Sequence, residues 1–303
     1  VLEWHVFTTD PEAEDEYTRT IDDFRADLEW LYAHDFYVVS LRDLVTNRIA
    51  APPGKHPVVL TFDDATAGQF RFLEGADGSL TVDPNSAVGV MEEMYTKHPD
   101  FGRGGFFAFL PFNCFAVPDE PEQEPFCDAK LRWLLDHGYE VGNHTFGHAD
   151  LLDVDDATFQ AEIGEAVLWL DEHAPGHDGD LMAMPYGNYP DPDLHARQVT
   201  WMRDGFVYEG RRIKLTGALK VGAEPALAPA DVAWDPLFIP RVQVFDAIME
   251  HWRPQFEDGE VILYTSDGNP RTVVVPADPS WLMESLDAGG AATQGRTVVR
   301  YDP

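Results

Sequence analysis

Two adjacent carboxylates, Asp63 and Asp64, follow directly after the apolar run VVLTF at 58–62. If that run is a strand of a parallel barrel, both side chains lie at its C-terminal end, where barrel enzymes place their active sites. Neighbouring carboxylates repel each other, and a bound cation would relieve the repulsion and divide their roles. One would bind the ion, while the other would stay free as a base. The alternative is a pair of turn or capping residues after a strand.

A second strand-like run, YEVGNH at 139–144, ends in His144, and His148 follows four residues later. If the segment forms one helical turn, both imidazoles lie on the same face and can chelate one ion. Two histidines at this spacing are, on their own, more often solvated or packed than metal-binding. Together with Asp64 they would form a three-ligand site with positions left for water and substrate, which is typical of a catalytic metal.

Strands must alternate with helices to position these residues. Helical patterns at 15–34 and 155–173 separate short apolar, β-branched or aromatic runs, which favours a parallel sheet. We predict an α/β fold, a distorted (β/α)7-type barrel forming one domain over 1–303, with loop insertions near 73–86 and 112–128. The expected strands are 37–41, 58–62, 104–110, 139–144, 181–186, 206–210, 237–244 and 261–266.

Three motifs occur in a fixed order: TFDD at 61–64, HTFGH at 144–148 and PYG at 185–187. They resemble the ordered motifs of the polysaccharide deacetylase family, whose catalytic domain is also called the NodB homology domain (carbohydrate esterase family 4). The motif-bearing core spans about 55–270, and the Trp4-His5 pair with the phrase at 28–45 also resembles N-terminal features of some members. The resemblance implies metal-dependent removal of N- or O-acetyl groups from a polysaccharide or oligosaccharide, with release of acetate.

Carried over position by position, the resemblance implies that Asp63 is the general base and that Asp64, His144 and His148 bind one divalent metal ion. Zinc is the expected ion, with cobalt or nickel as alternatives. Such an ion polarises the acetyl carbonyl and lowers the pKa of a bound water.

The substrate groove is expected beside the third motif. The resemblance implies that Pro185, Tyr186 and Gly187 form one wall, and that a backbone N–H near Tyr186 stabilises the oxyanion. Trp4 is a further candidate surface on which a pyranose ring could stack.

The chain departs from the family pattern at two places. The third motif usually has an arginine two residues before its proline, where this chain has Ala183. The last motif usually reads Leu-x-His-Asp, but here the run VILYTSDG has no histidine. Serine and threonine are poor acids near neutral pH. We hypothesise that Asp267 or His5 protonates the leaving group and that Arg241 orients Asp63.

Two other functions remain open. A relative with the same fold and metal could cleave a small non-polymeric amide, and the missing arginine and histidine also suggest a non-catalytic carbohydrate-binding protein. The retained base and metal ligands favour the enzyme.

The chain has 303 residues, with 54 Asp plus Glu against 21 Lys plus Arg and a net charge of −33. This balance argues against a nucleic-acid partner, which requires basic patches. No run approaches the ~20 apolar residues of a membrane span. The absence of an initiator Met and of a leader is what a processed or trimmed chain would show, and we expect an extracellular or cell-surface location with a carbohydrate as partner. Cys114 and Cys127 are either a loop-closing disulfide or two free thiols.

The dispersed acidic residues lead to the hypothesis of a protein adapted to high salt, because a Debye length of ~3 Å at molar ionic strength suppresses self-repulsion. We therefore expect the free energy of unfolding to be higher in molar KCl than in salt-free buffer, as measured by denaturant titration. Full stability in salt-free buffer would contradict the hypothesis.

Overall fold

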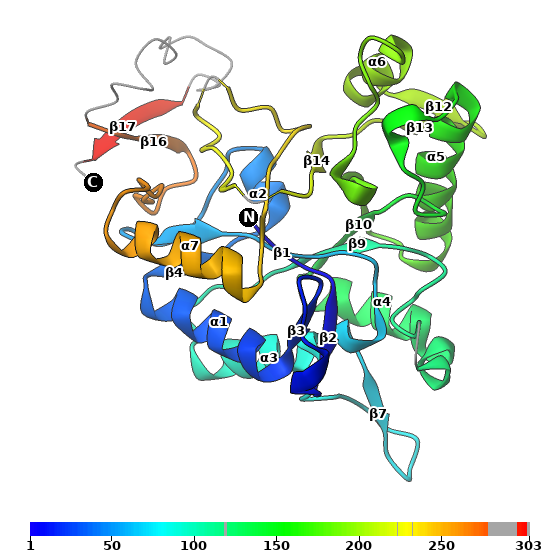
Figure 1. Ribbon diagram of the computed structural model, residues 1–303, viewed down its shortest axis with the longest axis horizontal. Helices are drawn as coiled ribbons and strands as arrows, with labels where there is room; N and C mark the ends of the chain where they lie inside the picture. Colours follow the sequence, from blue (N-terminus) through cyan, green and yellow to red (C-terminus); the bar gives the residue numbers. More distant parts are fainter. Residues whose placement is uncertain (118–119, 223, 232, 278–295, 302–303) are drawn as a thin grey trace.

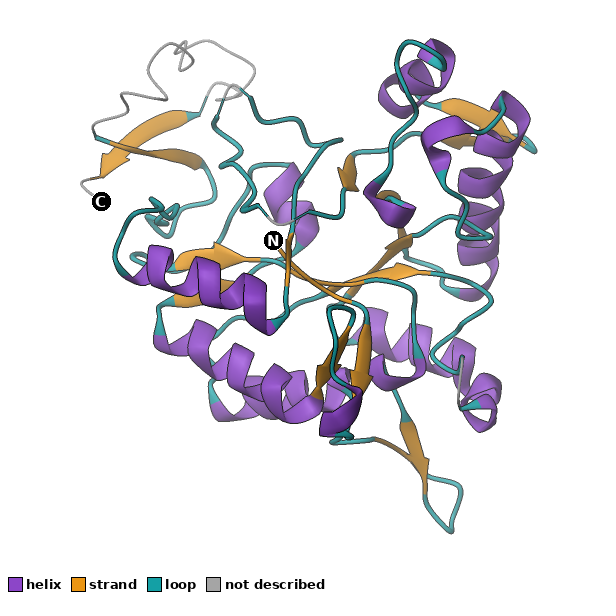
Figure 2. Cartoon of the chain, viewed as in Figure 1, coloured by secondary structure: helices purple, strands orange, loops and turns teal. Residues whose placement is uncertain are grey.

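Seven parallel strands form the central sheet of the protein, as seen in a computed structural model (Figures 1 and 2). The structure describes residues 1–117, 120–222, 224–231, 233–277 and 296–301. In spatial order the strands are β14 (Gly217–Leu219), β11 (Asp178–Ala183), β10 (Glu140–Asn143), β9 (Phe106–Phe109), β6 (Leu60–Phe62), β1 (Leu2–Trp4) and β15 (Val242–Gln243).

The two edges of this sheet are joined by one extended segment, 236–243. Val242 pairs with Leu2 of β1, and Ile239 forms a parallel bridge with Leu219 of β14. Because the segment pairs on both sides, it closes the curled sheet, and the expected α/β fold of the distorted (β/α)7 barrel type is confirmed. The assignment of residues 1–303 to one domain stays a prediction.

Helices cover the outside of the sheet. The N-terminal helices α1 and α3 pack against each other, and the helix expected at 155–173 is α5, capped by the Asp155 carboxylate, which accepts a hydrogen bond from Thr158 N–H. The helices of the described residues are α1 (Ile21–Ala33), α2 (Leu41–Val45), α3 (Ala87–Lys97), α4 (Cys127–Asp136), α5 (Asp156–His173), α6 (Ala196–Asp204) and α7 (Asp246–Glu257). None of them has the length and apolar character of a membrane span.

Short strand pairs form separate two-stranded sheets beside the seven-stranded sheet. The helix expected to begin at residue 15 begins only at Ile21, because residues 18–20 form a strand. The pairs are β2 (Val6–Thr8) with β3 (Thr18–Thr20), β4 (Phe36–Val38) with β5 (His56–Val58), β7 (Phe72–Glu74) with β8 (Leu80–Val82), β12 (Phe206–Tyr208) with β13 (Arg211–Ile213), and β16 (Thr272–Pro276) with β17 (Thr297–Tyr301).

Alternation along the strands separates two apolar cores. In β9, Phe106 and Ala108 join the cluster inside the barrel, whereas Phe107 and Phe109 join the cluster under the outer helices. Successive side chains of a strand point to opposite faces, which produces this division. In β1 the same alternation directs Trp4 into the cluster under the outer helices, and Glu3 points to the opposite face.

Two predicted strands differ from the structure, and one barrel strand was not predicted. Residues 206–210 contribute β12 to an antiparallel hairpin outside the barrel, and the barrel strand β14 was not predicted. The run at 261–266 is not a strand. Ser266 instead exchanges backbone hydrogen bonds with Gly54 and Lys55, because the place beside β1 is occupied by β15.

The two predicted insertions carry distinct features. Residues 73–86 include most of the β7–β8 hairpin, which projects from the body of the protein in Figure 1. In the segment 112–128, Cys114 and Cys127 form a disulfide, with their Cα atoms 5.5 Å apart. The neighbouring Asn113 donates its side-chain N–H to the backbone oxygen of Asp64, 2.8 Å away. The disulfide loop therefore supports the segment that carries the two carboxylates.

Candidate metal and catalytic site

Asp64, His144 and His148 converge at the C-terminal ends of β6 and β10. Oδ1 of Asp64 lies 3.2 Å from Nε2 of His144 and 3.3 Å from Nε2 of His148. Burial by itself raises the pKa of Asp64, but the hydrogen bonds with His144 and His148 outweigh it, and the pKa falls well below its usual range. The cluster predicted from sequence is therefore formed, with an ionised carboxylate between two imidazoles.

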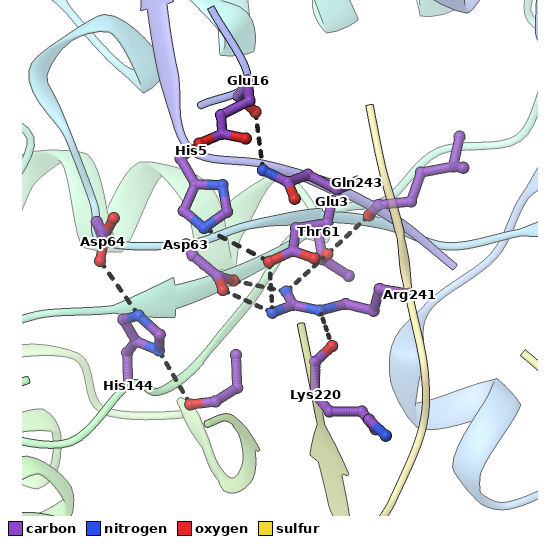
Figure 3. Close-up of polar contacts among 12 residues, drawn as sticks. Glu3, His5, Glu16, Thr61, Asp63, Asp64, His144, Lys220, Arg241 and Gln243 are labelled. Atoms are coloured by element: carbon purple, nitrogen blue, oxygen red, sulfur yellow. Dashed lines mark hydrogen bonds and ion pairs between the residues drawn. The ribbon is translucent and has the colours of Figure 1, made fainter. Parts of the chain in front are cut away.

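The donor atoms fit a small divalent ion. Two imidazole nitrogens and one carboxylate oxygen are a common ligand set for zinc, and ligands of a tetrahedral zinc site lie about 3.3 Å apart. Nδ1–H of His144 donates to the backbone oxygen of Ala183 at 2.9 Å (Figure 3), so Nε2 is the nitrogen that faces Asp64 and would bind the ion. The chain thus prepares this histidine as a ligand. His144, His148 and Asp64 would hold the ion.

The segment between the histidines is not the expected helical turn. Thr145 and His148 have positive φ angles of 63° and 57°. The tip is held from α5, where Glu162 accepts hydrogen bonds from the backbone N–H groups of Phe146 and Gly147. These backbone contacts, and not an i, i+4 relation within a helix, bring the two imidazoles together.

Asp63 is buried and paired with Arg241. The guanidinium donates two parallel hydrogen bonds of 2.7 Å to the two carboxylate oxygens (Figure 3). Burial tends to raise the pKa of Asp63, but the charge of Arg241 outweighs it and keeps the pKa below its usual value. Each carboxylate oxygen retains a lone pair for a further proton donor. Arg241 therefore occupies the orienting position hypothesised from the sequence.

Glu3 and His5 lie beside this pair. Oε1 of Glu3 is 2.8 Å from Nη2 of Arg241 and 3.4 Å from Nε2 of His5 (Figure 3). Burial raises the pKa of Glu3 to about 8 and lowers the pKa of His5. Nδ1 of His5 is buried and has no hydrogen-bond partner among the described residues.

Glu3, His5 and Asp63 also bring possible ligand atoms within 4.8 Å of one another. The guanidinium of Arg241 already pairs with Asp63 and lies 2.8 Å from Glu3, and a second cation there would be repelled. We therefore assign the metal position to Asp64 and the histidines, and not to this neighbouring cluster.

The third motif lies next to His148. Pro185 is buried, Tyr186 is exposed, and the ring centroids of Tyr186 and His148 are 4.8 Å apart. Tyr186 has a φ of 57°, a strained conformation for a residue with a side chain. A Cβ on Gly187 would come within 2.6 Å of Val221 N, so only glycine fits there. The motif does border the site, as predicted.

Two predicted site residues are placed elsewhere. Trp4 packs between Phe24 and Phe62 in the outer core and cannot reach a substrate. Asp267 caps a turn, accepting hydrogen bonds from Asn269 N–H and Thr272 Oγ1.

The reason in each case is the direction of a strand. Trp4 points to the face opposite Glu3 and His5. The neighbour of Asp267, Ser266, bonds to Gly54, which precedes β5, whereas Asp63 follows β6 at the other end of the same extended run. Trp4 as a sugar platform and Asp267 as the acid are therefore wrong.

Sequence reasoning missed Glu3 and the ligand-orienting carbonyl of Ala183. The sequence did contain a signal for Glu3. It lies two residues before His5, and alternation along the extended chain places both side chains on the same face. A backbone carbonyl leaves no signal in the residue types.

Comparisons with known proteins agree with this site. Residues 110–199 match the family model described as polysaccharide deacetylase, which confirms the resemblance predicted from the motifs. The matched segment contains His144, His148 and the PYG motif, and Asp63 and Asp64 precede it. A search of curated proteins finds no match.

Several solved structures share the fold. The Streptococcus pyogenes deacetylase PplD, in complex with acetate, has 17% identity and a TM-score of 0.56, over 80% of this chain and 91% of that chain. A polysaccharide deacetylase from Bacillus cereus has 14% identity and a TM-score of 0.56, over 84% and 67%. A de-N-acetylase from Aggregatibacter actinomycetemcomitans has 14% identity and a TM-score of 0.50, over 83% and 98%. At these identities the likeness establishes the fold.

The ligand cluster predicts zinc binding that depends on both histidines. Zinc at about 100 times its dissociation constant should stabilise the metal-stripped protein by about 2.7 kcal/mol, because it binds only the folded state. His144→Ala and His148→Ala should each weaken binding at least tenfold, by analogy with losses of ~10–100-fold for even the outer partners of metal ligands. Calorimetric titration and thermal unfolding measure both effects.

His177→Ala is the matched control, because His177 also pairs with a carboxylate, that of Asp171, 2.9 Å away. Zinc affinity that is unchanged in both ligand variants, or reduced equally in the control, would contradict the assignment.

Proposed function

We propose that the protein is a metal-dependent hydrolase that removes N- or O-acetyl groups from a polysaccharide or oligosaccharide and releases acetate. One observation carries the proposal: a three-ligand cluster with open positions lies directly beside a buried carboxylate that Arg241 holds ionised and oriented. The family match over 110–199 supports the same chemistry.

A divalent ion at Asp64, His144 and His148, zinc in our proposal, would polarise the acetyl carbonyl and acidify a water molecule. Asp63 accepts a proton from the attacking water as the water oxygen bonds to the carbonyl carbon. Arg241 keeps both oxygens of Asp63 in a fixed plane, so the base needs no reorientation during the reaction. The backbone N–H of Tyr186 is our candidate for stabilising the oxyanion.

His5 is the candidate for the proton donor that the last motif lacks. His5 lies in the same cluster as Asp63, and Glu3 approaches its Nε2. The carboxyl group of Glu3 on one imidazole nitrogen fixes the ring, and the charges of Asp63 and Asp64 offset part of the burial that lowers the pKa of His5. His5 then gives its proton to the leaving nitrogen or oxygen as the bond to the acetyl carbon breaks, so that an amine or alcohol and acetate are released.

We also propose an extracellular or cell-surface location and a high-salt environment. The Cys114–Cys127 disulfide supports the location, because disulfides persist in oxidising compartments. The charge of −33 supports the environment.

The main test is acetate release from acetylated chitooligosaccharide, acetylated xylan and peptidoglycan at molar salt with added zinc. Wild type should release acetate from one of them, and chelation should abolish the release. Asp63→Asn should lower kcat at least ~100-fold, because general base catalysis contributes about 10²–10⁴.

Release by wild type that Asp63→Asn matches would remove Asp63 as the base. Absence of release from every glycan, with zinc bound, would favour a small-amide hydrolase or a carbohydrate-binding protein. Turnover of simple acetamides separates these two.

The role of His5 predicts a dependence on the leaving group. His5→Gln should lower the deacetylation rate of an N-acetylated sugar about 10²-fold or more, because the amine leaves only when protonated. The same variant should hydrolyse 4-nitrophenyl acetate at nearly the wild-type rate, since nitrophenolate leaves without a proton. Equal losses on both substrates would indicate a structural role for His5.

A further inference from the structure

The exposed aromatic side chains of the described residues all lie on segments next to the candidate site. Among the described residues only four Phe, Tyr or Trp side chains are exposed, and the others are buried or half-buried. The four are Tyr17 (50% exposed), Phe112 (60%), Phe146 (37%) and Tyr186 (61%). A clustering of exposed aromatic surface marks a contact surface for a ligand or partner.

Two of them flank the metal ligands directly. The ring of Tyr186 lies edge-on to His148, at 4.8 Å between centroids. Phe146 lies between the two histidines in the sequence, and its backbone N–H donates to the backbone oxygen of Glu162 on α5. Both rings are therefore presented by backbone that is fixed on the barrel.

The other two are carried by neighbouring loops that are also tied to the site. Tyr17 packs edge-on against His5, at 5.4 Å between centroids, and its backbone oxygen accepts from Val6 N–H. The adjacent Glu16 accepts a hydrogen bond from Gln243 of β15 (Figure 3). Phe112 precedes Asn113, the residue bonded to Asp64.

The strand order arranges these residues in a row. Tyr186, Phe146 and Phe112 follow β11, β10 and β9, the carboxylates follow β6, and Tyr17 stands against His5 at the end of β1. Adjacent strands are about 4.8 Å apart, so the row from β11 to β1 follows an arc of roughly 19 Å around the mouth of the curled sheet. This span matches a short oligosaccharide and exceeds a single sugar.

We propose that these four rings are stacking platforms for successive pyranose units of a glycan chain, with the acetyl group to be cleaved between Phe112 and Tyr17. Tyr186, Phe146 and Phe112 hold the chain on one side of the reacting acetyl group, and Tyr17 holds it on the other. The site therefore acts on internal units of a chain. This inference rests on the proposed function and adds the mode of substrate binding to it.

The chemistry of the platforms favours this ligand. The apolar C–H faces of pyranose rings pack on aromatic rings, whose large rigid surfaces contribute most of the contact energy in binding sites. A small amide bound at the metal ligands would touch only the nearest rings, and it would leave Tyr17 and Phe112 exposed.

The test compares substrates of different length. Tyr17→Ala and Phe112→Ala should each raise KM for a hexasaccharide about tenfold, in line with a loss of one aromatic contact, with kcat nearly unchanged. The substrates are N-acetylchitohexaose and an acetylated xylohexaose, with 4-nitrophenyl acetate as the short substrate. Hydrolysis of the short substrate should be unaffected. Phe112→Trp should retain the wild-type KM, and Phe112→Leu should not.

Val207→Ala is the control, because Val207 is an equally exposed apolar residue on β12, away from the row. Equal effects on long and short substrates, or KM values for both hexasaccharides that do not change in the platform variants, would overturn the inference. If wild type hydrolyses no substrate, the proposed function fails. Calorimetric binding of the hexasaccharides then still tests the platforms, whose variants should bind about tenfold more weakly.

Discussion

The site depends on one buried cation. The guanidinium of Arg241 is fully buried and lies between Asp63 and Glu3, two carboxylates that could not be buried together without it. Burial opposes the charged form of Arg241, but the two carboxylates outweigh it and keep the pKa of Arg241 above its usual value. The bonds of Arg241 to Thr61 and to the backbone oxygen of Lys220 tie β6 and the end of β14 to the same group. The charge that orients the base therefore also holds together strands from different parts of the barrel.

The support of the metal ligands is of a different kind. Asp64 and Ala65 have positive φ angles of 74° and 52°, and both interact with the disulfide-bonded segment: Asn113 donates to Asp64, and Phe115 N–H donates to Ala65 O. Strained backbone persists only where the surroundings over-determine it. Here the surroundings include a loop closed by Cys114 and Cys127. The insertion predicted at 112–128 therefore stabilises the turn that carries Asp64.

Much of this arrangement could be predicted from the sequence. The motifs located the candidate base, the candidate ligands and the wall formed by the third motif, because these residue types at strand ends indicate their chemistry directly. Arg241 was predicted as a replacement for the arginine that the third motif lacks at Ala183. The errors came from geometry that residue types do not encode. Trp4 was assigned to the substrate without the alternation rule, which sends it away from His5, and Asp267 was assigned from its motif alignment, although its segment is excluded from the sheet by β15. Tyr17 and Phe112 have no motif, and only their exposure in the folded protein distinguishes them.

The segment that closes the barrel also supplies an arginine that the third motif lacks. In the motif that this chain resembles, the orienting arginine belongs to the strand before the proline of the third motif, where this chain has Ala183 in β11. Here the cation comes from residue 241, in the segment that lies beside β14, two places from β11 around the closed ring of strands. In a closed ring of strands, long side chains from several different strands can reach the same central point. The requirement is for a cation at one location in space, and a search that demands an arginine at one sequence position would miss Arg241.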